Sequence, residues 1–161
     1  MRIHHLAGIV LIALGGACGD TAQREDHPSQ TAGATRPRSM VGRWALDSFV
    51  ANGKDYTSEV RSSPTDFYTF NGDGTFGIAR RDSLLVTGSW SEDTTASPMT
   101  FDHRMSDAGK PGSRLLGIFA VTGDTLVITI TGAHADGRRP ATFHSALADS
   151  SELLVLHRAP R

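Results

Sequence analysis

The stretch LLGIFAVTGDTLVITIT, residues 115–131, decides the fold of this chain. After the Gly123-Asp124 pair, Leu126, Ile128 and Ile130 alternate with β-branched residues, and residues 115–121 show the same period before it. Alternation with period two is typical of a half-buried strand, and a Gly-Asp pair between two such runs is typical of a hairpin turn. The stretch therefore predicts two adjacent antiparallel strands.

The same pattern of short alternating runs and turn residues continues in both directions from this hairpin. Earlier runs lie at residues 43–50, 67–70, 75–81, 84–91 and 99–103, and later runs at 141–146 and 153–158. The connections are too short for helical crossovers, so the strands should pair antiparallel. The pattern predicts an all-β fold, a sandwich or barrel of eight or nine antiparallel strands. One short helix is expected at residues 54–62.

The hexapeptide GDGTFG, residues 72–77, has the glycine spacing of a dinucleotide-binding loop. That site needs a helix directly after the loop, because the helix N-terminus receives the pyrophosphate. A strand pattern follows here instead, and no HRD or DFG sequence of a kinase is present. The segment is therefore interpreted as a hairpin turn.

No catalytic pattern stands out in the chain, which has neither a G-x-S-x-G nor an H-E-x-x-H motif. His134, His144 and His157 could meet in the fold, but scattered histidines are more often surface or structural groups. We expect no enzymatic activity, no cofactor and no metal site. The formal net charge is −1 with interspersed charges, so no basic stripe predicts nucleic-acid binding.

Residues 1–17 have the pattern of a secretory signal peptide. A positively charged start is followed by the apolar run LAGIVLIAL, residues 6–14, and by the small residues Gly15, Gly16 and Ala17. Nine apolar residues are too few to span a bilayer, which needs about 20. The sequence therefore predicts export, with cleavage between Ala17 and Cys18.

Cys18 is the single cysteine of the chain. Directly after the predicted cleavage site, it resembles the lipobox cysteine of bacterial lipoproteins, whose thiol takes a diacylglycerol. The resemblance implies a protein held in the bacterial cell envelope, at the outer membrane or the periplasmic face, by an N-terminal lipid. The family prefers Leu where this chain has Gly15, and the alternative is a plain secreted protein.

Residues 18–39 form the predicted linker. After Cys18 this segment has no aromatic residue and no aliphatic residue larger than Ala before Met40, and it is rich in Thr, Ser, Gly, Pro and mixed charge. Such a stretch buries too little apolar surface to offset the entropy of ordering it. Residues 40–161 are then left as one domain.

The segment GRRPATF, residues 137–143, is interpreted as the entry to a strand. Pro140 fixes its own φ and biases Arg139 toward extended geometry. We expect a strand at 141–146 with Phe143 buried, and Arg139 bound to backbone carbonyls at the rim. The alternative role for this segment is contact with an anion or a partner.

The motif Gly42-Arg43-Trp44 opens the first strand and His157-Arg158 closes the last. This pairing resembles lipocalins and lipocalin-like barrels, in which a G-x-W tryptophan plugs the barrel floor and a late arginine stacks on it. A guanidinium over an indole face contributes about 0.5–2 kcal/mol. The resemblance implies structural roles for Gly42, Trp44 and Arg158.

A second resemblance covers nearly the whole domain. The succession GRW, FNGDGTF, LLGIFAVTGDTL, GRRPATFHS and LLVLHR resembles an uncharacterised secreted lipocalin-like domain family abundant in planctomycete-type bacteria. It implies the fold and the envelope location. It implies no known activity.

Two functions are open to a lipocalin-like barrel. Eight strands are just wide enough to hold one small ligand, and also narrow enough for side chains to fill the interior. In the first case a small apolar or amphipathic ligand would bind among inward-facing residues, which alternation assigns as Trp90, Phe101, Phe119, Leu126 and Ile128. In the second, the filled barrel would be a structural or protein-interaction module of the envelope.

Overall fold

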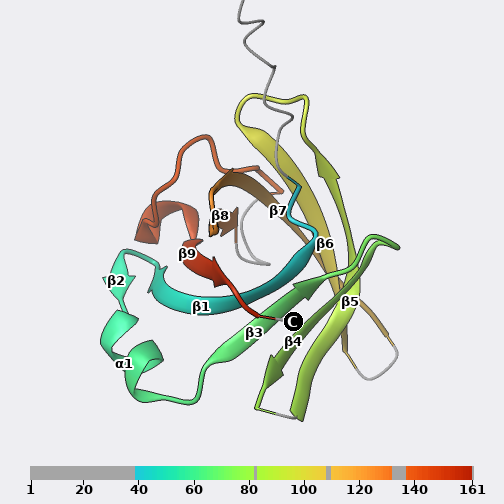
Figure 1. The fold of residues 1–161 in the computed structure, drawn as a ribbon. Coiled ribbons are helices and arrows are strands. Elements are labelled where there is room, and N and C mark those ends of the chain that lie inside the picture. Colours follow the sequence, from blue (N-terminus) through green and yellow to red (C-terminus); the bar gives the residue numbers. More distant parts are fainter. Residues whose placement is uncertain (1–38, 82, 108–109, 132–136, 161) are drawn as a thin grey trace, which may run out of the picture. The chain divides into compact units, whose positions relative to one another are not determined.

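The computed structural model describes residues 39–81, 83–107, 110–131 and 137–160 (Figure 1). The predicted signal peptide, Cys18 and the linker up to residue 38 lie outside the described residues. The elements are β1 (Gly42–Ala51), β2 (Lys54–Asp55), α1 (Thr57–Ser62), β3 (Asp66–Phe70), β4 (Thr75–Arg80), β5 (Ser83–Asp93), β6 (Met99–Asp107), β7 (Lys110–Thr122), β8 (Thr125–Thr131), the 3₁₀ turn η1 (Leu147–Asp149) and β9 (Ser151–Arg158).

The strands form a closed antiparallel barrel. From β3 to β9 each strand pairs with the next along the chain, and β1 pairs with both β3 and β9. Figure 1 shows β1 between these two strands. The short strand β2 pairs only with the end of β1, as an addition to the eight-stranded barrel. The predicted all-β antiparallel barrel is confirmed.

Strand register places one side of every strand in the barrel interior. The hairpin of β7 and β8 pairs Phe119 with Ile128 and Val121 with Leu126, as the alternation of residues 115–131 predicts. The interior core also contains Phe70, Phe76, Trp90, Phe101 and Leu156, each at most 8 % exposed. The segment 71–74 is a turn between β3 and β4, which confirms the interpretation of GDGTFG as part of a hairpin.

One end of the barrel, which we call the floor, is closed by Trp44, Arg158 and Met40. Trp44 is fully buried, and the guanidinium carbon of Arg158 lies 4.2 Å from the centre of its ring. Trp44 Nε1 donates to the Met40 carbonyl at 2.8 Å, and Met40 is itself fully buried. Gly42 has a φ of +142°, and a Cβ there would stand 2.7 Å from Arg158 Nη1. The structure thus confirms the contact expected between Trp44 and Arg158.

The opposite end, which we call the mouth, carries α1 and the connection between β8 and β9. The predicted helix at 54–62 is shorter in the structure, because Lys54 and Asp55 pair with β1 as β2. Asp55 Oδ1 accepts a hydrogen bond from the Thr57 N–H at 2.8 Å, where the helix begins. Residues 63–65 then lead back to β3.

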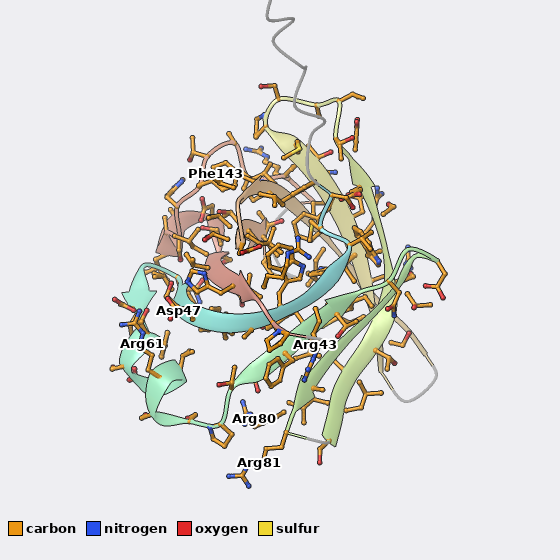
Figure 2. All side chains as sticks on the ribbon, viewed as in Figure 1. Arg43, Asp47, Arg61, Arg80, Arg81 and Phe143 are labelled. Carbon is orange, nitrogen blue, oxygen red and sulfur yellow. The ribbon has the colours of Figure 1, made fainter. Side chains whose placement is uncertain are left out.

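The predicted strand at 141–146 is wrong. These residues form bends and irregular backbone, and Phe143, expected to be buried, is 38 % exposed (Figure 2). The reason lies in the barrel's closure. Because β8 already pairs with β7 and β9, and β9 with β8 and β1, neither β8 nor β9 has a free edge for residues 141–146. Pro140 therefore precedes an irregular connection rather than a strand.

Arg139 ties this connection to the wall of the barrel. Its Nη1 donates to the carbonyls of Phe101 at 2.6 Å and Gly117 at 2.5 Å, and its Nη2 to Asp102 Oδ1 at 2.6 Å. Partial burial acts to raise the pKa of Asp102, but Arg114 and Arg139 outweigh it, so that pKa lies below its ordinary value. The expected bonds from Arg139 to backbone carbonyls are confirmed.

Candidate functional site: a cavity inside the barrel

The barrel interior holds a cavity of about 200 Å³ above the floor. Most of its wall is apolar, and it also contains one histidine, one tyrosine and one glutamate. Its lining residues are Tyr68, Phe70, Phe76, Ile78, Phe101, His103, Met105, Leu115, Ile128, Ile130, Glu152 and Leu154. They come from six strands, β3, β4, β6, β7, β8 and β9, so that closure of the barrel is what brings them together.

His103 occupies the middle of β6 and faces the cavity. Its ring stacks on Phe76 at 5.3 Å between centroids with 12° between the planes, and lies 5.8 Å from Phe101. The side chain is 8 % exposed, and its Nε2 has no hydrogen-bond partner in the described part of the chain. Burial lowers its pKa from 6.5 to about 4, while Asp102 acts in the opposite direction. His103 is therefore neutral at pH 7.

Glu152 stands near the mouth, one residue into β9. It pairs with Ile130 of β8 and Ala51 of β1, on the same face as Leu154 and Leu156. Six residues of strand separate it from Arg158, or about 20 Å at 3.3 Å per residue. Glu152 is half-buried, and burial raises the pKa of its carboxyl.

Tyr68 lies on the wall shared by this cavity and a second one. The second cavity, of about 310 Å³, lies between β1, α1 and the start of β3. Glu59, Asp66 and Arg80 also line it. Burial raises the pKa of the Tyr68 hydroxyl, with further contributions from Asp66 and Glu152, so the phenol is neutral at pH 7. Tyr68 thus offers a neutral hydroxyl at the boundary of the two spaces.

Of the five residues predicted to bind a ligand, the structure brings two to the cavity wall. Phe101 and Ile128 line it. Trp90, Phe119 and Leu126 face the interior but pack in the core outside the cavity lining. Their part in ligand binding stays a prediction.

The position of the Phe101 ring depends on a glycine in the neighbouring strand. Gly117 pairs with Phe101, and a Cβ at Gly117 would stand 2.1 Å from that ring. A side chain at position 117 would therefore displace Phe101, so this part of the cavity wall needs glycine there.

Sequence reasoning missed Tyr68, His103 and Glu152. The signal that could have found them is their position in the strand alternation, because each shares a strand face with an apolar neighbour two residues away. His103 follows Phe101, Glu152 precedes Leu154, and Tyr68 precedes Phe70. A polar residue in phase with a buried face is a candidate interior group.

Within the described residues, no three His, Cys, Asp or Glu side chains are grouped so that they could hold a metal ion. His144 Nε2 lies 3.6 Å from Asp149 Oδ2 and His157 Nε2 3.8 Å from Asp47 Oδ2, while His134 lies outside the described residues. None of the helices among the described residues has the length and apolar character to cross a bilayer.

No family model, curated protein or solved structure matches the chain. A barrel of this kind hosts many unrelated functions, so the function has to be argued from the cavity itself.

Proposed function

We propose that this protein binds a small apolar or amphipathic molecule inside its barrel. The observation that carries the proposal is the cavity of about 200 Å³, into which the buried His103 projects with no hydrogen-bond partner for its Nε2 among the described residues. A buried polar atom without a partner costs about 1–3 kcal/mol, and a ligand that hydrogen-bonds to His103 would remove that cost. A ligand that fits an apolar space with a few polar groups is the ordinary occupant of such a site.

The size of the cavity limits the ligand. Drug-sized ligands occupy pockets of about 300–1,000 Å³, whereas an apolar cavity of about 150 Å³ admits benzene. The space here therefore suits a molecule with one ring or a short chain. A longer ligand would have to extend past Tyr68 toward the cavity beside α1.

The competing function is a filled barrel that acts as a structural or protein-interaction module. It has support from the tight packing below the cavity, where Trp44, Phe119, Leu126 and Leu156 are at most 1 % exposed. Native mass spectrometry of the protein, purified gently from the cells that produce it, separates the two. An added mass in stoichiometric amount that leaves on solvent extraction supports a ligand-binding barrel, and a bare chain supports the filled one.

The proposal extends to the cell envelope through Cys18. Its support is the sequence alone, in which the single cysteine follows a predicted signal peptide. In a bacterial host, labelled fatty acid should be incorporated into the wild-type protein and not into Cys18→Ala. Equal labelling of the variant would contradict the anchor and leave the secreted alternative.

A further inference from the structure

The feature that refines this proposal is the carboxylate of Glu152. It lines the cavity, and no ion pair or hydrogen bond to it occurs within the described residues. Burying a charge without a partner is costly, and natural chains retain such groups mainly at functional sites. An acid without a partner among the described residues, in a cavity with a mostly apolar wall, therefore calls for a positive partner.

Of the described cations around the mouth, Arg80 and Arg61 are committed to other acids, and Lys54 of β2 lies with its Nζ 4.6 Å from the centre of the Tyr56 ring. Arg80, at the end of β4 (Figure 2), donates from Nε to Asp66 Oδ1 at 2.6 Å and from Nη2 to Asp66 Oδ2 at 2.9 Å. Arg61 of α1 donates to Asp47 at 3.1 Å. From inside the cavity, Glu152 is faced by Tyr68 and His103, both neutral at pH 7. Within the described part of the chain, these groups leave Glu152 without an ion-pair partner.

Aromatic rings make up much of the remaining wall. Phe70 and Phe76 lie 5.3 Å apart between centroids, and Tyr68 and Phe101 complete the aromatic lining. The faces of these rings offer an apolar surface against which the body of a small ligand can pack. A carboxylate beside such rings favours a ligand that is both cationic and apolar.

We propose that the cavity selects small organic amines, with the ammonium group paired to Glu152 and the apolar body among the aromatic rings. This inference rests on the proposed function. Because Glu152 stands near the mouth, the charged end faces outward and the body reaches down toward Ile128 and Leu154. An anionic ligand of the same shape would meet the like charge of Glu152.

The test compares three probes of one shape and different charge. Benzylammonium, toluene and benzoate are titrated into the full-length protein, and binding is followed by calorimetry and NMR. We expect benzylammonium to bind at least tenfold more tightly than toluene, and benzoate to bind most weakly. In Glu152→Gln the affinity for benzylammonium should fall to that for toluene, while toluene binding stays unchanged.

Glu59→Gln is the matched control, because Glu59 lines the neighbouring cavity beside α1. It should keep the preference for the amine.

Lowering the pH should weaken benzylammonium binding as Glu152 takes up a proton, and this dependence should disappear in Glu152→Gln. The variant should also unfold at a higher temperature at pH 7, since it no longer buries an unpaired charge, and this gain shows that it is folded.

The outcomes separate this inference from the function on which it rests. If toluene and benzylammonium bind equally, or if Glu152→Gln keeps the preference, the barrel binds ligands but Glu152 does not select amines. If the preference is lost in Glu59→Gln instead, the amine site lies beside α1. If none of the three probes binds, both the amine inference and the proposed binding of ligands of this size are wrong.

Discussion

His103 and Glu152 lie in a protein interior where apolar side chains would be more stable. His103 Nε2 has no described hydrogen-bond partner, and the carboxylate of Glu152 has no described counter-ion. Each is therefore a local cost in a barrel whose other interior positions follow the apolar pattern closely. Conflicts of this kind between a residue and its fold are expected where a site serves function.

We expect His103 to make the fold sensitive to acid. Its pKa is about 4 in the folded protein against an ordinary 6.5, so below pH 6.5 the unfolded chain binds a proton that the folded chain does not. The free energy of unfolding then falls as the pH falls from 6.5 to about 4, by about 3 kcal/mol in all at 1.36 kcal/mol per pKa unit. His103→Phe keeps a ring beside Phe76 and Phe101 and should remove this loss, as measured by urea unfolding at pH 7, 5.5 and 4.5.

His157→Gln is the control for this measurement, because His157 is exposed on the outer face of β9. Its acid sensitivity should match that of the wild type. An unchanged pH dependence in His103→Phe would show that His103 is not the group responsible.

At the scale of elements, alternation predicted the positions of the strands well, but it predicted the connection at 141–146 and the lining of the cavity poorly. The runs at 43–50, 67–70, 84–91, 99–103, 115–121, 126–130 and 153–158 all lie in strands, and the run at 75–81 does so except for its last residue, because one buried face imposes the period. Residues 141–146 have a similar composition, but the strands on either side of them, β8 and β9, have no free edge to join, because β1 and β9 close the barrel. The cavity was only partly predictable for the same reason. Alternation shows which residues face inward, but it does not show which of them line the cavity and which pack in the core.

Arg139 is the residue through which the connection between β8 and β9 is fixed to the barrel. Arg139→Ala removes three hydrogen bonds, one of them to the charged Asp102. Hydrogen bonds to charged groups contribute about 1.5–3 kcal/mol, so we expect a loss of about 2–3 kcal/mol in the free energy of unfolding. Arg139→Lys keeps the charge without the planar fork and should lose a smaller part of it. Urea unfolding monitored by tryptophan fluorescence measures both.

Arg138→Ala is the matched control, because Arg138 is the exposed neighbour. A surface substitution of this kind should change the free energy of unfolding by about 0.5 kcal/mol or less. An equally small effect of Arg139→Ala would mean that the connection is held by other contacts, such as the bond from Ser145 Oγ to the Ser151 carbonyl at 2.7 Å.

For the whole molecule, closure joins the two ends of the domain. Trp44 in the first strand pairs with Arg158 in the last, and the pair is sealed by Met40 and by Glu92, which accepts hydrogen bonds from the Met40 N–H and from Ser39 Oγ. The floor is thus built from both ends of the domain. The mouth, by contrast, has no packed plug of this kind among the described residues, and the cavity lies on that side.

Whether the barrel is hollow or filled is a property of the whole interior, and β8 offers a matched comparison. Ile128 lines the cavity, whereas Leu126, two residues earlier on the same face, lies fully buried outside its lining. Overpacking a filled core costs about 1–3 kcal/mol, so Leu126→Phe should lose that much. Ile128→Phe places its added volume in the cavity and should change the free energy of unfolding by less than about 1 kcal/mol.

Ile130→Phe, at a second lining position on the same strand, should behave like Ile128→Phe. Both cavity variants should also displace any bound ligand, because they occupy its space, whereas Leu126→Phe should retain binding in the fraction that remains folded. Chemical denaturation gives the stabilities, and native mass spectrometry gives the occupancy. If all three substitutions destabilise the protein equally, the interior is filled, and the barrel's outer surface becomes the place to look for its function.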